Sequence, residues 1–432
     1  MIPLKVKNPW IFFAPFLVLY TCIIYIFQGA TLTGDEPRYI QFAQNLLHGF
    51  YSPKEELNLW NGPGYPLLIA PFIKIGFNTT GLRIINGVLQ YASVVLLYQT
   101  LLYWVSEKKA LVLSLFWACY YIAFKEMTYV YTECFANFLV SLFLYYCSKS
   151  LVSPNPSSNK TSNQIFYSLF KCILPGIILG WIVLTKVIFG YVIIALAFLL
   201  FIFYIVKKET TYLRFFYITV IALFINIPYL FYTYQLTGKA FYWSNAGGMS
   251  LYWASTPIEG EYGDWNDAEF RAYCGYDSLL PCNAALFAKG HQQDYNEIYK
   301  YAGVARDEAF KQKAMDNIRQ HPAKYFKNTL ANTGRFFFGI PGSYQYMRYQ
   351  NLWRILPNAI VFCIFLFSAA VSLLNIKKHP PLLVVLLSVL FFYFGASIVV
   401  SALQRQLYVV LPIILVWFGW LTQKAITLKL RF

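Results

Sequence analysis

The chain has 432 residues, of which 58% are hydrophobic, 20% are aromatic and only 12% are charged. A soluble protein carries roughly a quarter charged residues, so this composition excludes an ordinary soluble enzyme. The formal net charge of +16 does not indicate a nucleic-acid-binding protein. The basic residues sit mainly in short loops between apolar runs, which is the distribution that membrane orientation requires.

Repeated apolar runs near the length of a bilayer crossing predict an all-α polytopic membrane protein. We expect ten spans, at residues 10–28, 83–105, 110–124, 132–149, 167–185, 187–206, 213–235, 355–375, 381–401 and 407–423. The first run lacks a small-residue cleavage site and is expected to be a retained helix. With both termini in the cytosol, the cytosolic segments hold only two carboxylates, Glu107 and Glu209, and the positive-inside rule favours this orientation.

Two of the predicted outer segments are too long to be connectors, and they divide the chain into three parts. Residues 1–235 form an N-terminal transmembrane module that contains a first outer loop, 29–82. Residues 236–354 form an outer helical subdomain, and residues 355–432 form the C-terminal transmembrane helices.

Both outer segments are expected to contain amphipathic helices at the membrane–water interface. In the first segment, apolar residues recur at helical spacing after Pro37, and a Pro- and Gly-rich patch at 65–77 is too short to span. In the second, 306–319 and 322–338 are predicted helices. The latter is basic and aromatic, as suits a helix resting on the outer membrane surface.

The adjacent carboxylates Asp35 and Glu36 follow the first span directly and precede the amphipathic helix. One interpretation is that they cap this helix and interact with its positive end. The other interpretation is that they take part in catalysis, since two carboxylates at the level of the membrane are energetically unfavourable and are usually retained for a function. A carboxylate there can accept a proton from a hydroxyl group while that oxygen attacks.

Glu133, at the outer end of the fourth span, either lines a cavity or follows a capping Thr132. Glu126 is expected to pair with Lys125 or with water. Three cations, Arg38, Lys186 and Arg405, fall on the outer side in the predicted topology, where cations at helix ends often extend to lipid phosphates. The alternative is that they neutralise the phosphate of a lipid-linked donor and stabilise it as a leaving group.

The cysteines and histidines give weaker signals. Cys274 and Cys282 lie eight residues apart in the second outer segment and could form a disulfide if that segment lies outside the cytosol. The four histidines have no ligand spacing, so a metal site built by the protein alone is not predicted. A divalent cation held jointly by carboxylates and a donor phosphate stays open.

Several motifs resemble polyprenyl-phosphate-sugar-dependent glycosyltransferases of the glycosyltransferase C superfamily, in the group of protein O-mannosyltransferases and lipid A aminoarabinose transferases. The most telling is Gly-Asp-Glu-Pro-Arg-Tyr after the first span. The others are Asn61–Leu67, Thr132-Glu133, the Gly180–Lys186 segment with its Leu-Thr-Lys ending, Asn245–Trp253, His321-Pro322, and Arg405 near Tyr408 and Pro412.

The resemblance implies an inverting transferase in which Asp35 deprotonates the acceptor hydroxyl. Glu36 would orient it or help to hold a metal. Lys186 and Arg405 would bind the donor phosphate, and Arg38 could do the same or form a salt bridge with the Asp35–Glu36 pair. Asn61, Tyr65 and Glu133 are expected to line the cavity. Aminoarabinose transferases tend to have a Glu-Lys-Pro-Pro-like segment where this chain has Asn-Gly-Pro-Gly at 61–64, so lipid A and aminoarabinose are not assumed.

The sequence therefore predicts a multi-pass enzyme of a bacterial inner membrane, with its active site on the outer face. It would move a sugar from a polyprenyl phosphate to a lipid-linked glycan, lipopolysaccharide or protein; membrane lipids are expected partners and nucleic acid is not. Alternatives are a polymerase or ligase using a lipid-linked oligosaccharide, and a flippase or transporter of lipid-linked sugars. No internal repeat is found, and the candidate charges gather at the outer surface, which favours the enzyme.

Overall fold

The computed structural model describes residues 6–151, 163–266, 284–344 and 352–425, and within these ranges all regular structure is helical. The first half of the chain contains α1 (Pro9–Phe12), α2 (Ala14–Phe27), α3 (Glu36–Leu47), α4 (Gly64–Lys74), α5 (Thr79–Leu101), α6 (Glu107–Ala118), α7 (Tyr121–Glu126), α8 (Glu133–Leu151), α9 (Asn163–Thr185), α10 (Ile188–Lys207) and α11 (Thr210–Thr237). The second half contains α12 (Gly247–Ala254), α13 (Ala284–Ile298), α14 (Gly303–Gln320), α15 (Pro322–Phe338), α16 (Leu352–Leu374), α17 (Pro381–Val400) and α18 (Gln404–Trp420).

Each predicted span coincides with helical structure, but two of the spans are broken. The first is divided at Phe13 into α1 and α2, and a proline stands in the first turn of each. The span predicted at 110–124 is divided at Cys119 and Tyr120 into α6 and α7.

Within the described residues, six helices are long and apolar enough to cross a membrane, and two shorter apolar helices accompany them. The chain is therefore a multi-pass membrane protein by length and composition of its helices. The number of ten spans stays a prediction.

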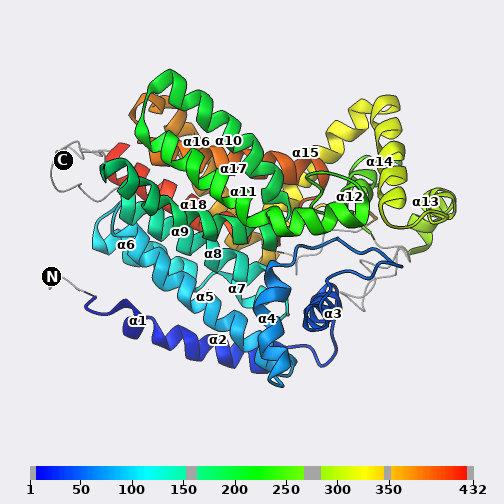
Figure 1. Ribbon diagram of the computed structural model, residues 1–432, viewed down its shortest axis with the longest axis horizontal. Helices are drawn as coiled ribbons and strands as arrows, with labels where there is room; N and C mark the ends of the chain where they lie inside the picture. The colour runs from blue at the N-terminus through cyan, green and yellow to red at the C-terminus, as the bar shows by residue number, and fades with distance from the viewer. Residues whose placement is uncertain (1–5, 152–162, 267–283, 345–351, 426–432) are drawn as a thin grey trace.

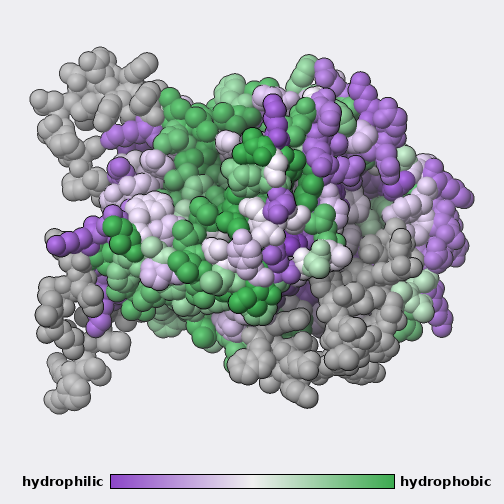
Figure 2. Space-filling model, turned by 90° about the horizontal axis from the view of Figure 1, so that it is seen from below, coloured by the Kyte–Doolittle hydropathy of each residue, from purple (hydrophilic) through white to green (hydrophobic). Residues whose placement is uncertain are grey.

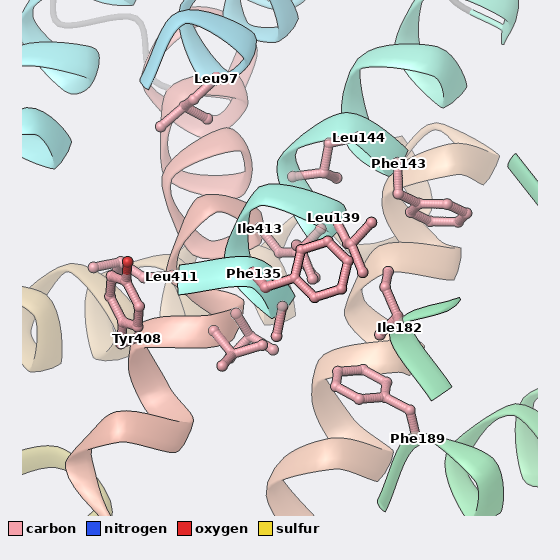
Figure 3. Packing of buried hydrophobic residues seen from close by; sticks show 14 of the residues in the cluster. Leu97, Phe135, Leu139, Phe143, Leu144, Ile182, Phe189, Tyr408, Leu411 and Ile413 are labelled. Carbon is pink, nitrogen blue, oxygen red and sulfur yellow. The ribbon is translucent and has the colours of Figure 1, made fainter. Parts of the chain in front are cut away.

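The helix α18 lies at the centre of the bundle. Its residues from Leu407 to Leu415 are all buried, and they pack against α5, α8 and α16. Figure 3 shows part of this core, where Phe135 and Leu139 of α8, Ile182 of α9, Phe189 of α10 and Ile413 of α18 come together. Because one helix contacts so many others, its first turn can present a side chain beside loops from distant parts of the chain.

The outside of the bundle is apolar, as expected for a surface that faces lipid. Figure 2 shows a broad hydrophobic area across the middle of the molecule, with hydrophilic residues gathered at the end formed by α13 and α14. Large apolar side chains such as Phe198, Phe224 and Phe391 are exposed on α10, α11 and α17. A soluble protein rarely exposes so large a patch.

The helices α12 to α15 lie at the end of the molecule opposite α1 (Figure 1), within the segment that the sequence predicts to be the outer subdomain. The helices α12 to α14 have their own core, in which Trp253, Phe287 and Phe310 are buried, whereas Phe336 and Phe337 of α15 belong to the main core. The predicted helices 306–319 and 322–338 correspond to α14 and α15. Cys274 and Cys282 lie outside the described residues.

The side-chain amide of Asn245 connects the second predicted outer segment to the first outer loop by hydrogen bonds. Asn245 Oδ1 accepts a hydrogen bond from the Leu59 backbone N–H at 2.9 Å, and Asn245 Nδ2 donates to the Leu57 carbonyl at 3.1 Å. The Asn245–Trp253 motif thus begins at the junction between the two outer segments.

Candidate active site

Asp35 is held between two arginines from opposite ends of the chain. Its Oδ2 accepts a hydrogen bond from Arg405 Nη1 at 2.9 Å, and its Oδ1 is paired with Arg38. Asp35 stands at the start of α3 but makes no capping hydrogen bond there. Its side chain keeps 20% of its surface exposed. Burial raises the pKa of Asp35, but the guanidinium groups of Arg405 and Arg38 outweigh it and hold the pKa below its usual value.

Arg405 also joins Asp35 to a second carboxylate, Glu133. The distance from Arg405 Nε to Glu133 Oε1 is 3.6 Å, and the same oxygen accepts a hydrogen bond from Lys186 Nζ at 2.5 Å. Glu133 is fully buried at the first residue of α8, and Lys186 lies at the junction of α9 and α10. Glu133 therefore faces cations rather than an open cavity.

The residues Arg38, Asp35, Arg405, Glu133 and Lys186 form one alternating cluster of charges, which we call the charge cluster. Three of its members are cations and two are carboxylates, so the charge cluster has an excess of one positive charge. An excess cation in a partly buried position is suited to bind an anion, because interactions between charges are stronger where water is scarce. The structure thus brings together five of the residues singled out from the sequence and adds their pairing.

Aromatic rings cover the two arginines. Arg38 lies 5.0 Å from the centre of the Trp60 ring, and Arg405 lies 5.3 Å from that of Tyr131. Such contacts between a cation and a ring orient the guanidinium group without neutralising it. Arg38 therefore retains its charge for a second anionic partner.

Glu36 occupies a different place from its neighbour Asp35. It is fully buried, and Oε1 accepts hydrogen bonds from Arg83 Nη2 and the Val130 backbone N–H, both at 2.8 Å. Its Oε2 accepts from the Thr33 backbone N–H at 2.9 Å. Arg83 in turn donates to the Gly29 carbonyl at 2.9 Å. Glu36 thus fixes the loop that carries Asp35 and has no surface for a substrate.

Arg83 was not singled out from the sequence, although a signal was present. It stands at the edge of an apolar span, where an unpaired arginine would be costly, and such a residue is usually paired or functional. The pair of Arg83 and Glu36 is buried at 3% and 0% exposure of the two side chains. It connects α5 with the start of α3.

Asn61 and Tyr65 position other residues of the site. Asn61 Oδ1 accepts from Arg38 Nε at 2.7 Å, and Asn61 Nδ2 donates to the Tyr39 hydroxyl at 2.9 Å. Tyr65 is fully buried, with its hydroxyl 3.1 Å from Asn86 Oδ1. Of the predicted cavity-lining residues, neither Tyr65 nor Glu133 has an exposed surface in this conformation.

The glycines of the Asn-Gly-Pro-Gly segment are required by close packing. A Cβ atom on Gly62 would lie 2.0 Å from the Leu184 carbonyl oxygen, and one on Gly64 would lie 2.4 Å from Thr185 Oγ1. The segment therefore lies directly against the end of α9, next to Lys186. This packing gives a physical reason for the departure from the Glu-Lys-Pro-Pro-like pattern.

Glu126, at the end of α7, is buried rather than exposed to water. Its Oε2 has no hydrogen-bond partner among the described residues. Burial, together with the nearby charge of Glu133, raises the pKa of Glu126 to about 7. It is therefore a carboxyl group that is partly protonated near neutral pH, beside the charge cluster.

A divalent cation held jointly by the charge cluster and a donor phosphate stays a prediction. Among the described residues no group of three or more His, Cys, Asp or Glu side chains is placed to hold a metal ion. Each oxygen of Asp35 is paired with an arginine, whereas the two cations near Glu133 both lie against its Oε1.

An apolar groove of about 260 Å³ opens between the first outer loop and α11. Leu184 lies in its wall, two residues before Lys186. The groove is lined by Leu46, Gly49, Phe50, Tyr51, Pro63, Leu67, Leu184, Ile225, Pro228, Tyr229 and Tyr232. The groove is thus an apolar surface near Lys186 in sequence, and no residue of the charge cluster lines it.

Comparison with solved structures finds several chains with a weak similarity in fold. ArnT from Cupriavidus metallidurans bound to undecaprenyl phosphate shares 14% sequence identity, over 96% of this chain and 77% of that chain, with a TM-score of 0.43. The Archaeoglobus fulgidus oligosaccharyltransferase tethered with an acceptor peptide shares 13%, over 95% and 49%, with a TM-score of 0.49. AglB from Archaeoglobus fulgidus with an inhibitory peptide and dolichol-phosphate shares 13%, over 95% and 50%, with a TM-score of 0.46.

This chain spans about half the length of the archaeal oligosaccharyltransferases. No family model matches the sequence, and no curated protein matches it. The similarity of the three solved structures is weak and identifies neither a donor nor an acceptor for this chain.

Proposed function

We propose that the protein is an inverting membrane glycosyltransferase that uses a polyprenyl-phosphate sugar. The observation that carries the proposal is the charge cluster, in which an ionised, partly exposed carboxylate stands beside an excess of positive charge. A glycosyl transfer from a lipid phosphate needs both, namely a base for the acceptor and cations for the phosphate that leaves.

The reaction follows from these groups. The acceptor hydroxyl oxygen attacks the anomeric carbon of the donor sugar, and its proton passes to Asp35. The bond from that carbon to the phosphate oxygen breaks, and the electron pair leaves with polyprenyl phosphate. Arg38, Arg405 and Lys186 stabilise the negative charge that grows on the phosphate, because charge-assisted hydrogen bonds to phosphate are strong.

Asp35 is a weak base while both arginines bind it, so the donor also has a role in its activation. A donor phosphate that binds Arg405 and Arg38 competes with Asp35 for the same N–H groups. The loss of these contacts raises the pKa of Asp35 and makes it a better proton acceptor. The carboxylate of Asp35 would then be an effective proton acceptor only when the donor is bound.

The donor is lipid-linked in this proposal because an apolar groove includes Leu184, two residues before Lys186 of the charge cluster. A prenyl chain in the groove would be in contact with Leu67, Leu184 and Tyr229. The acceptor is a glycan, a lipid or a protein on the same side of the membrane. A polymerase or ligase that uses a longer lipid-linked glycan would employ the same groups.

The charge cluster lies on the extracytoplasmic face in this proposal, with both termini in the cytosol of a bacterial inner membrane. The start of α1 and the end of α18 lie at one end of the molecule, and the outer subdomain lies at the other (Figure 1). The same orientation satisfies the positive-inside rule.

The test is transfer of label from a panel of polyprenyl-phosphate sugars by the purified protein in proteoliposomes, with cell-envelope extracts as acceptors. A labelled glycan, lipid or protein product supports the proposal. Movement of intact lipid-linked sugar across the bilayer without any such product would instead identify a transporter. Arg38→Gln together with Arg405→Gln is the matched variant, because it removes phosphate binding and is expected to abolish transfer.

A further inference from the structure

The helix α15 buries its polar face and exposes its apolar face, the reverse of an amphipathic helix in a soluble domain. Its polar side chains Asn328, Asn332 and Arg335 are buried, whereas Phe326 and Leu330 are 63% and 56% exposed. Phe326 and Leu330 are four residues apart and therefore lie on one face of the helix. In a soluble protein this face would be expected to point into the core.

The buried polar face fixes this orientation. Asn328 Nδ2 donates to the Thr256 carbonyl at 2.9 Å, and Asn332 Nδ2 donates to the Ile398 carbonyl at 2.8 Å. Arg335 Nη1 donates to the Pro341 carbonyl at 2.9 Å. A rotation of α15 would leave these buried groups without partners, which is unfavourable.

The helix α15 contacts the candidate membrane spans α16 and α17 near both of its ends. At the end of α15, the rings of Phe336 and Phe337 pack against Phe394 of α17 and Phe362 of α16, with centroids 4.7 and 4.9 Å apart. Near its start, the Tyr325 hydroxyl donates to the carbonyl of Val399 at 2.8 Å, one residue before α17 ends. The helix therefore lies at the level where a membrane span ends.

A cation completes the pattern. Lys327 is exposed between Phe326 and Leu330, next to the apolar face. A lysine at this position can extend its ammonium group to lipid phosphates while its methylene groups stay among apolar chains. Apolar residues flanked by a cation, beside a span end, have the chemistry of a helix that binds a bilayer surface.

We propose that α15 is an in-plane membrane helix, with Phe326 and Leu330 among the acyl chains of the leaflet nearest the charge cluster. This docking holds the outer subdomain on the bilayer. It also supports the start of α18, because Gln404 Nε2 lies 3.5 Å from the Phe337 carbonyl oxygen and Arg405 is the next residue. The proposal does not depend on sugar transfer.

The test is spin-label accessibility of the full chain in proteoliposomes. A single cysteine is placed at Phe326→Cys or Leu330→Cys, in a background in which the native cysteines are replaced. Phe391→Cys, on the exposed surface of α17, is the lipid-facing control, and Lys311→Cys on α14 is the water-facing control. Collisions with oxygen report lipid, and collisions with a water-soluble nickel complex report water.

The expected result is an oxygen-to-nickel accessibility ratio at 326 and 330 that is several-fold above that at 311 and close to that at 391. A ratio equal to that at 311 would overturn the proposal, because the face would then lie in water. Labels that are immobilised and shielded from both reagents would also overturn it, because a protein partner would then cover the face.

A second measurement uses the wild-type chain and needs no cysteine replacement. A photoactivatable phospholipid in the bilayer is expected to modify the tryptic peptide that contains Leu330, and a water-soluble reagent of the same chemistry is not. The opposite labelling pattern contradicts the proposal even if the cysteine variants do not fold.

Discussion

Replacement of Glu36 by Gln tests whether two adjacent carboxylates have separate roles. Glu36 accepts hydrogen bonds from Arg83 and from the backbone N–H groups of Thr33 and Val130, and it has no exposed surface. The variant removes the charge that compensates Arg83 and directs a donor NH2 group toward other donors. We therefore expect Glu36→Gln to destabilise the protein strongly.

The magnitude follows from the burial of the pair. Removal of one partner of a buried ion pair costs about 3–5 kcal/mol, because the other charge stays buried without compensation. For a chain of this length, that cost lowers the unfolding midpoint by on the order of 4 °C. Glu308→Gln is the matched control, since Glu308 pairs with Lys239 at the surface and is 46% exposed. Exposed pairs contribute only about 0–1 kcal/mol.

The assay is thermal unfolding in detergent at a fixed heating rate, in parallel with sugar transfer in proteoliposomes. Arg83→Met combined with Glu36→Gln is expected to cost less than the sum of the two single variants, because the double variant leaves no unpaired charge. A Glu36→Gln protein with wild-type stability and no transfer would refute the reasoning, because Glu36 would then act on the substrate.

Three further predictions concern pH and the groove. Glu126 has a pKa of about 7, above its usual value, so its stabilising contribution is complete at low pH and is lost as pH rises through 7. Glu126→Gln should therefore raise the unfolding temperature at pH 9 but hardly at pH 5, and an equal gain at both would contradict this. The acid limb of the pH profile for kcat/KM should lie at lower pH than the acid limb for kcat. In the free enzyme the arginines lower the pKa of Asp35, whereas in the proposed donor complex they bind the phosphate instead. Acid limbs at the same pH would argue against this exchange of partners. Leu67→Trp, which narrows the groove, should raise KM for a long-chain donor but not for a short-chain analogue, and equal effects on both donors would show that the prenyl chain lies elsewhere.

The sequence predicted the helical membrane fold because apolar runs of the length of a bilayer leave few alternatives to a helix. It did not predict the breaks at Phe13 and between α6 and α7, since a span and two short helices in line have the same hydropathy. The start of α18 at Gln404 was also missed. The predicted span begins three residues later, and Arg405 therefore lies in the first helical turn instead of a loop.

For the candidate site, the sequence indicated the residues but not their pairing. Loop charges placed Asp35 and Arg405 on the same side of the membrane, yet their contact joins residues 370 positions apart and depends on the helix packing. Asp35 and Glu36 have different surroundings because Arg83 pairs with Glu36 alone. In the sequence, Arg83 was recognised only as the first residue of a predicted span. The side chains of two adjacent residues at the start of a helix can face different environments, one buried and one partly exposed. A hydropathy pattern does not predict which side chain is buried.

The most direct test of the central claim is the rate of sugar transfer by Asp35→Asn with saturating donor in proteoliposomes, compared with the wild type at equal amounts of folded protein. Because a positioned general base contributes about 10²–10⁴-fold, we predict a loss of that size with donor binding retained. Transfer by Asp35→Asn at the wild-type rate would contradict the assignment of Asp35 as the base.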